Sequence, residues 1–353
     1  MPPDKWINYL RKNLFKKHDG FFELPYLSNN PQLMLDSIIN MPVSDHNKLE
    51  QAIYTDNPFT KGVMRYRKIE EGLWLLASDL RVKQNIISKA LYDENEISDY
   101  YFLSFSVFEY RFPMNSSITE SATLLSTTCT FYKPGTEVTT YFYEGTRGRF
   151  YNLVFNKKWA KTNLALKSTA EKHEVNEYLN EQSGFINWLD IVPNAPALSK
   201  ELWDKLSAEK VGDLKTPGLK MQIRQIISDF FKHAFEDKRI KNYTALHNPD
   251  YANVAAAEKL ILHNLTTTFM GVEKIARAVN LSPTKLKMIF KSVFGFSMLQ
   301  YHKEKNMLLA LQLIRHSDIQ IKNIAAATGY LSSSKFTASF KKRFGLLPTE
   351  IRK

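Results

Sequence analysis

A pattern of about two dozen residues occurs twice in the C-terminal part of this chain. Residues 272–295 align with residues 321–345, at an offset of 49 before the middle of the pattern and 50 after it. The one-residue slip falls between two helical segments, where an insertion is tolerated best. The repeat therefore predicts two copies of one small structural unit. The matching positions are Ile275-Ala276 with Ile324-Ala325, and Leu286, Phe290-Lys291 and Phe294-Gly295 with Phe336, Phe340-Lys341 and Phe344-Gly345.

Each copy is predicted to be two helices joined by a tight turn. In the first copy, Asn280 tolerates the left-handed conformation that ends a helix, Ser282-Pro283 supplies an N-cap and a first-turn proline, and Gly295 ends the second helix. In the second copy, Gly329 provides the turn and Ser332 or Ser333 the cap. Such a helix-turn-helix unit can place its second helix in the major groove of DNA. The apolar residues expected to face inward are Val272, Ile275, Ala276, Val279, Leu286, Ile289, Phe290 and Val293 or Phe294, then Phe336, Phe340 and Phe344.

A connecting helix is expected between the copies, from about residue 297 to residue 316. Its apolar stripe of Leu299, Met307, Ala310, Leu311 and Ile314 suggests that both units pack against it. Twenty residues at about 1.5 Å each make a rod of roughly 30 Å, and one turn of B-DNA is roughly 34 Å long. Such a spacer could place two recognition helices in successive major grooves on one face of the duplex.

The net charge of +12 belongs almost entirely to the same segment. Residues 251–353 contain 16 Lys/Arg and 5 Asp/Glu, whereas residues 1–250 contain 32 and 31, so the two parts carry +11 and +1. Such an uneven distribution is typical of a nucleic-acid-binding module. A solvated basic surface, or a helical module that binds a protein, is the alternative interpretation.

The C-terminal segment also carries a long series of residues in register, from Ile275 to Arg352. With this series it resembles the DNA-binding domain of the AraC/XylS family of bacterial transcription regulators, over about residues 255–352. Ala338, Leu347 and Ile351 depart from the family pattern, which often has arginine, serine and an aromatic residue there. The matching residues are Ile275-Ala276, Leu281-Ser282-Pro283, Phe290-Lys291, Phe294-Gly295, Tyr301, Ala310, Leu313, Ile324-Ala325, Gly329-Tyr330, Phe340-Lys341-Lys342, Phe344-Gly345, Pro348 and Arg352.

Two sets of outward residues are candidates for DNA contact. Base-edge contacts set sequence preference, whereas phosphate contacts set register and affinity. For each lysine a solvated surface position is the alternative, and for Met288 it is a gap-filling core position. Because Met288 and Ala338 stand where arginine could read guanine, more apolar contact with thymine methyl groups is expected. The predicted base readers are Thr284, Lys287, Met288, Ser333, Ser334, Thr337 and Ala338, and the predicted phosphate contacts are Lys285, Lys291, Lys335, Lys341 and Lys342.

The rest of the chain predicts an α+β, multidomain protein. We expect a helical and irregular segment at 1–60, a β-rich domain at 61–165, a helical region at 166–241, a linker at 242–250 and the DNA-binding domain at 251–353. Alternation in residues 103–107, the strand formers of residues 139–143 and the turns Pro134-Gly135 and Glu144-Gly145 suggest a sandwich or a small barrel. The resemblance implies a sensor domain there, cupin-like in many family members.

Ligand sites in the N-terminal part are less defined. The β-rich stretch has no histidine, the usual metal ligand in such barrels, which argues against a metal-binding cupin and predicts no metal and no cofactor. Its many aromatic residues could line an apolar pocket or fill the core, and Arg147 and Arg149 beside Gly145 and Gly148 would suit an anion. The apolar stripe of residues 219–234 could pair two subunits or cover its own barrel, and Asn248-Pro249-Asp250 is expected to interrupt a helix.

Several classes of function are excluded or disfavoured. The sequence contains no run of about 18 apolar residues, so no membrane span is predicted. The N-terminus does not resemble a secretory signal, so a cytoplasmic protein is expected. The single cysteine, Cys129, excludes an internal disulfide framework and disfavours a DNA-repair alkyl-transfer enzyme. The expected protein is therefore not an enzyme but a sequence-specific DNA-binding transcription regulator, with a constitutive DNA binder as the alternative. Its expected partners are double-stranded DNA, a small-molecule effector, a second copy of the chain and, for an activator, RNA polymerase.

Overall fold

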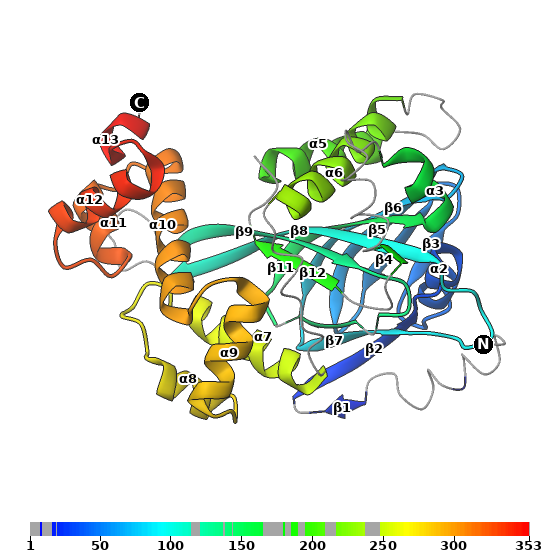
Figure 1. The fold of residues 1–353 in the computed structure, drawn as a ribbon, viewed down its shortest axis with the longest axis horizontal. Helices are drawn as coiled ribbons and strands as arrows, with labels where there is room; N and C mark the ends of the chain where they lie inside the picture. Colours follow the sequence, from blue (N-terminus) through cyan, green and yellow to red (C-terminus); the bar gives the residue numbers. More distant parts are fainter. Residues whose placement is uncertain are drawn as a thin grey trace. The chain divides into compact units, whose positions relative to one another are not determined.

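The computed structural model of the chain describes residues 8, 16–18, 20–113, 121–136, 138–142, 144–164, 179–180, 185–189, 195–208, 217–236 and 248–352. The chain divides into two compact units (Figure 1). The first unit comprises residues 1–108 and 127–245, and the second comprises residues 109–126 and 246–353. In the described part of the chain, no helix combines the length and the apolar character needed to cross a membrane.

Two sheets form the β-rich part of the chain, as the strand patterns predict. The smaller sheet has the order β1-β2-β7-β10, with β2 and β7 parallel. The larger sheet has the order β12-β9-β8-β11-β6-β5-β4-β3. The strands of the smaller sheet are β1 (Lys17–His18), β2 (Phe21–Leu27), β7 (Ile86–Leu91) and β10 (Thr139–Phe142). Those of the larger are β3 (Asp45–Asn47), β4 (Ala52–Asp56), β5 (Thr60–Glu70), β6 (Leu73–Val82), β8 (Tyr100–Pro113), β9 (Ser121–Tyr132), β11 (Arg147–Asn156) and β12 (Phe185–Leu189).

The expectation of a helical and irregular segment at residues 1–60 is wrong for the part that the structure describes. Strands β2, β3 and β4 lie in this segment, together with helix α2 (Pro31–Ile39). Strand β2 contains Pro25 and lacks regular alternation, and it pairs in parallel with β7, whose sequence lies some 60 residues further on. Its sequence, FFELPYL, has no period-two pattern that would have identified the strand, and its partner lies too far along the chain to be found from neighbouring residues.

Alternation along the strands sends side chains to two apolar layers. Phe102 and Val154 join Leu35 of α2 in one buried cluster. The neighbouring residues Tyr101 and Phe155 point to the opposite face, because successive side chains of a strand alternate. There Tyr101 stacks on Phe131 with ring centroids 5.6 Å apart.

Helix α6 (Pro217–Glu236) covers this second layer. Its Phe230 and Phe231 rings lie 5.8 Å and 5.2 Å from the ring of Phe131, and its residues Leu219, Ile223, Ile226 and Ile227 are buried. Of the two roles predicted for this stripe, the structure shows the helix covering its own sheet. The aromatic side chains named here likewise fill the core. Pairing of two subunits stays a prediction.

Helices α3, α5 and α6 are fixed to the larger sheet by polar contacts as well. Glu70 on β5 accepts hydrogen bonds from Trp159 of α3 (Lys157–Asn163) at 2.8 Å and from Arg224 of α6 at 2.7 Å. Lys220 of α6 lies 2.5 Å from the same carboxylate. On α5 (Ala195–Ala208), the carbonyl of Ser199 accepts a hydrogen bond from the hydroxyl of Tyr151 at 2.5 Å. The half-buried carboxylate of Glu70 therefore joins three elements that are far apart in the sequence.

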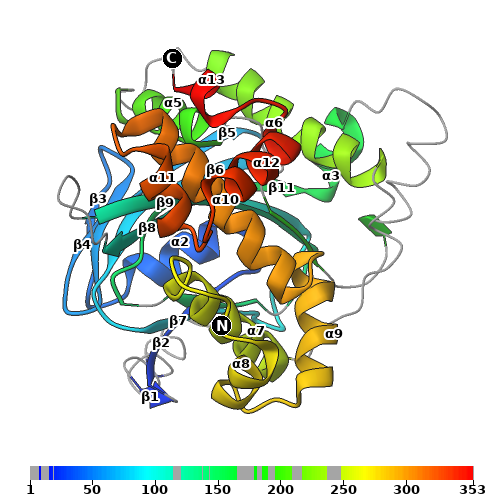
Figure 2. The same ribbon diagram turned by 90° about the vertical axis from the view of Figure 1, so that its left-hand side faces the viewer.

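The second unit is helical, as the repeat predicts. Its helices are α7 (Asn248–His263), α8 (Val272–Ala278), α9 (Pro283–Phe294), α10 (Met298–His316), α11 (Ile321–Ala327), α12 (Ser333–Phe344) and α13 (Pro348–Ile351). In Figure 2, α7–α9 gather at one end of α10 and α11–α13 at the other. The segment Asn248-Pro249-Asp250, expected to interrupt a helix, instead begins α7, because proline is well tolerated in the first turn.

The ends of strands β8 and β9, residues 109–113 and 121–126, belong to this second unit. Within it, the side-chain amide of Gln312 on α10 bonds the backbone of Leu125 on β9 at two points. The Leu125 N–H donates to Gln312 Oε1 at 2.9 Å, and Gln312 Nε2 donates to the Leu125 carbonyl at 3.3 Å. One side chain thus satisfies both polar groups of a backbone position, as a neighbouring strand would.

Candidate nucleic-acid interface

The two turns of the repeat have the same hydrogen-bond geometry. The amide of Leu281 donates to the carbonyl of Ala276 at 3.0 Å, and the amide of Tyr330 donates to that of Ala325 at 2.9 Å. Asn280 adopts φ 53° and Gly329 φ 78°, both in the left-handed region. The predicted turn residues are therefore confirmed, and each turn delivers the chain to the start of a recognition helix.

Each recognition helix begins and ends in the same way. Ser282 caps α9 and Ser332 caps α12, each side chain accepting from the amide three residues on. Gly295 and Gly345 end the helices with φ 73° and 77°, a conformation that glycine adopts at little cost. Of the two caps predicted for the second copy, the structure selects Ser332.

Helix α9 turns its predicted apolar face inward and its predicted DNA face outward. Leu286, Ile289 and Phe290 are buried. Met288 is 66% exposed, so the core position proposed as its alternative is excluded in this structure. The predicted contact residues Thr284, Lys285, Lys287, Met288 and Lys291 are all exposed.

Helix α12 repeats this arrangement with one difference. Phe336 and Phe340 are buried, and Thr337 is half-buried, so only part of its side chain is open to contact. The other predicted contact residues, Ser333, Ser334, Lys335, Ala338, Lys341 and Lys342, are exposed. The structure therefore brings both predicted sets to the outer faces of the two recognition helices. Their roles on DNA stay predictions.

Helix α10 is joined to α12 and to α7 by polar contacts that the sequence did not reveal. The guanidinium of Arg343, near the end of α12, donates to both carboxylate oxygens of Glu304 on α10, at 2.8 Å and 2.9 Å. One turn earlier on the same helix, the hydroxyl of Tyr301 donates to Glu258 on α7. Burial raises the pKa of Glu258, and the hydrogen bond from Tyr301 offsets part of this rise. Nineteen residues of α10 span about 28 Å.

Leu331 is the exposed residue that the sequence interpretation missed. The turn residues Leu281 and Tyr330 correspond at an offset of 49, whereas the caps Ser282 and Ser332 correspond at an offset of 50. Leu331 is thus the one additional residue of the second copy, and its side chain is fully exposed. The slip in the alignment was the available clue to its position.

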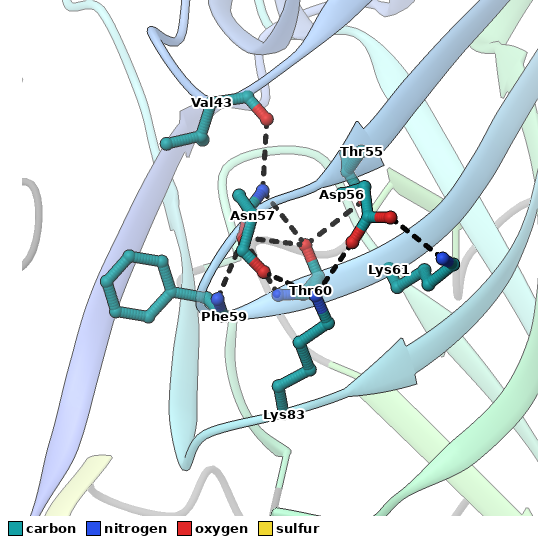
Figure 3. A network of polar contacts seen from close by, with 8 residues as sticks. All are labelled: Val43, Thr55, Asp56, Asn57, Phe59, Thr60, Lys61 and Lys83. Atoms are coloured by element: carbon teal, nitrogen blue, oxygen red, sulfur yellow. Dashed lines mark hydrogen bonds and ion pairs between the residues drawn. The ribbon is translucent and has the colours of Figure 1, made fainter.

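A shallow depression of about 830 Å³ lies beside the β4–β5 turn of the first unit, lined in part by Val43, Asp56 and Lys61. Figure 3 shows that the polar groups here bond one another. Asp56 lies 2.8 Å from Lys61 and 2.7 Å from Lys83, and hydrogen bonds from these two lysines lower the pKa of Asp56 to about 2. Asn57 donates to the carbonyl of Val43 at 3.0 Å and accepts from the amide of Phe59 at 2.8 Å. These groups serve to hold the turn.

The other groups considered for chemistry are also engaged in packing. Burial raises the pKa of the Cys129 thiol to about 12, the opposite of what a nucleophilic thiolate needs. Arg149 donates to Asp79 at 2.9 Å and lies over the ring of Trp203. Among the described residues, no three His, Cys, Asp or Glu side chains gather closely enough to hold a metal ion.

The match to a family model lies in the C-terminal unit. Residues 275–353 match the family described as "Helix-turn-helix domain". The transcriptional regulator AlkR of Acinetobacter baylyi is 31% identical over 109 residues, which cover 31% of this chain and 34% of AlkR. ExsA of Pseudomonas aeruginosa is 38% identical over 77 residues, covering 22% and 28%. The arabinose operon regulatory protein of Salmonella typhimurium is 27% identical over 108 residues, covering 31% and 38%. The chain therefore aligns with little more than a third of these curated relatives.

Two solved structures are similar at lower identity. The DNA-binding domain of AdpA, solved with a target DNA, is 25% identical, covers 28% of this chain and 89% of its own, and gives a TM-score of 0.27. ToxT of Vibrio cholerae, solved with an unsaturated fatty acid, is 15% identical, covers 80% and 96%, and gives a TM-score of 0.28. Both scores are below 0.5, so neither comparison defines the overall fold.

Proposed function

We propose that this chain, whose C-terminal domain is a helix-turn-helix domain of the AraC type, regulates transcription by binding specific DNA sequences. The observation that supports this proposal is the outer surface of α9 and α12. Six lysines and most of the smaller predicted base readers are exposed there, on two helices with matching turns and caps. A helix that is preceded by such a turn and carries exposed cations is suited to the major groove.

The proposed assignment of residues to base edges or to phosphates follows from their positions on each helix. Thr284, Lys287 and Met288 share one face of α9 by the i, i+3, i+4 rule and would contact base edges. Lys285 and Lys291 lie beside this face and would contact phosphates. On α12, Ser333, Ser334, Thr337 and Ala338 would read bases, and Lys335, Lys341 and Lys342 would contact phosphates. A spacer of about 28 Å, close to the roughly 34 Å of one DNA turn, would let both helices bind one face of the duplex.

The first unit would regulate this binding, by recognising a small molecule or by pairing two copies of the chain. A signal changes DNA occupancy only if it favours one state of the protein over another. For an activator, RNA polymerase would be a further partner. A DNA-modifying enzyme that acts through a cysteine is disfavoured, because burial holds the pKa of the Cys129 thiol at about 12.

Selection from genomic fragments with the purified full-length chain tests the proposal. The expected result is a site with two segments about one helical turn apart, bound at least about 10³-fold more tightly than a scrambled fragment of the same composition. The affinity for both fragments should fall with salt, because lysines release counterions from DNA. Equal affinity for the selected and the scrambled fragment would contradict sequence-specific binding and leave only electrostatic attraction.

A further inference from the structure

Both recognition helices present an apolar side chain where DNA would lie. Met288, in the middle of α9, is 66% exposed and stands one residue after Lys287 and four after Thr284. It has no place in the buried stripe of Leu286, Ile289 and Phe290. Met288 therefore makes no core contact, and its thioether is open to contact with a partner.

Leu331 holds a comparable position before α12. It is the additional residue of the second copy, it directly precedes the N-cap Ser332, and it is fully exposed. The N-terminal end of a recognition helix is the end that contacts base edges in helix-turn-helix proteins. The insertion therefore adds an exposed apolar side chain at the end of α12 that would approach the bases under the proposed function.

The polar side chains best suited to reading purines are scarce on the same helices. Guanine is read most often by arginine or lysine, and adenine by asparagine or glutamine. Neither α9 (PTKLKMIFKSVF) nor α12 (SSKFTASFKKRF) contains asparagine or glutamine. Their single arginine, Arg343, donates to both carboxylate oxygens of Glu304 and lies in the last turn of α12. Lysine, serine and threonine remain for hydrogen bonding.

From these observations we infer that Met288 and Leu331 recognise the 5-methyl groups of thymines, one in each segment of the DNA site. The thymine methyl group is the apolar feature that base pairs display in the major groove. The neighbouring lysines Lys285, Lys291 and Lys335 supply the attraction to phosphate that brings these side chains against the bases. This inference rests on the proposed function and specifies how its sequence preference arises.

The expected size of the effect follows from burial of a methyl group. Removing one buried methyl or methylene group from contact weakens binding by about fourfold. Two independent contacts would therefore contribute about 16-fold together. Since each contact lies on a different recognition helix, the two thymines should lie in different segments of the site, about one helical turn apart.

The test replaces thymine by deoxyuridine, which keeps every hydrogen-bonding group and lacks only the methyl. The full-length chain is first used to select its preferred site from random duplexes. Each thymine of that site is then replaced singly, and the affinity is measured by titration at constant salt. We expect an approximately fourfold loss at one position in each segment and little change at the other thymines, which serve as controls in the same duplex.

Variants of the protein assign each position to a side chain. Met288→Ala should abolish the effect of deoxyuridine in one segment and leave the effect in the other, and Leu331→Ala should do the reverse. Both side chains are exposed, so neither variant removes core contacts. Lys287→Ala is the matched control on α9, because it should weaken binding while leaving both effects of deoxyuridine intact.

The outcomes separate this inference from the proposed function. A preferred site that is bound equally well after every replacement would overturn the inference and leave sequence-specific binding established. Effects of deoxyuridine that persist in both variants would also overturn it, because other side chains would then contact the methyl groups. Selection that returns no preferred sequence would overturn the proposed function and this inference with it.

Discussion

The carboxylate of Glu70 offers the sharpest test of how the first unit is held together. It accepts hydrogen bonds from Trp159 and Arg224 and pairs with Lys220, so it joins strand β5 to helices α3 and α6. Burial raises the pKa of Glu70, but hydrogen bonds from Lys220, Trp159 and Arg224 outweigh this effect and lower it from 4.5 to about 2. Glu70→Gln removes the charge and keeps the size of the side chain.

The expected loss in the free energy of unfolding on Glu70→Gln follows from this pKa. A shift of this size corresponds to about 3 kcal/mol at 1.36 kcal/mol per unit. Lys220 and Arg224 are 38% and 39% exposed, so water screens both pairs and we expect about 1–2 kcal/mol. Because the folded-state pKa is the lower one, the contribution is complete above about pH 5 and is lost as the pH falls towards 2. The difference between the wild type and Glu70→Gln should therefore shrink by at least about half at pH 3.

Tryptophan fluorescence during urea unfolding measures this difference in the intact chain. All five tryptophans, Trp6, Trp74, Trp159, Trp188 and Trp203, belong to the first unit, so the signal follows that unit alone. Glu71→Gln is the matched control. Glu71 is the next residue, and its pair with Lys68 is exposed to solvent, so its loss should change stability little. Equal destabilisation by both substitutions, or a Glu70→Gln effect that is as large at pH 3 as at pH 7, would refute the reasoning.

Three further predictions concern the second unit. Lys287→Ala should cost about 1–3 kcal/mol on the preferred DNA sequence in a binding titration, whereas an equal loss on random DNA would identify Lys287 as a phosphate contact. Gly295→Ala should lower the stability of the second unit by about 1 kcal/mol in circular dichroism melts, because φ 73° is strained for alanine even though space for its Cβ is open; an unchanged melting temperature would contradict this. Gln312→Ala should speed hydrogen exchange at the Leu125 amide, which loses its acceptor, and unchanged exchange would show that the contact is dispensable.

The local interactions of the second unit explain how much of it could be predicted. Asn280, Gly295 and Gly329 adopt the left-handed conformations that their positions in the repeat require. Ser282 and Ser332 cap helices whose buried residues follow the apolar spacing. A helix is stabilised by backbone hydrogen bonds between residues four apart, so its bounds, caps and inner face are determined by neighbouring residues. The same spacing placed the lysines on the outer surface.

The first unit was less predictable because its contacts are non-local. Strand β2 pairs in parallel with β7, and neither its proline nor its apolar run marks it as a strand. Glu70 meets Arg224 across 154 residues of sequence, and nothing beside either residue identifies its partner. The sequence also left open the role of the aromatic residues in the β-rich stretch, because the same rings suit a pocket lining or a packed core.

The sequence by itself determined a basic, duplicated helix-turn-helix domain, since charge, caps and apolar spacing are properties of neighbouring residues. Only the tertiary structure decided that α6 covers its own sheet, that Arg343 is held by Glu304, and that Leu331 stands exposed before α12. The first two depend on which distant groups meet when the chain is packed, and such meetings leave no pattern in the residues on either side. The third depends on no group packing over Leu331, which the slip in the repeat located but could not decide.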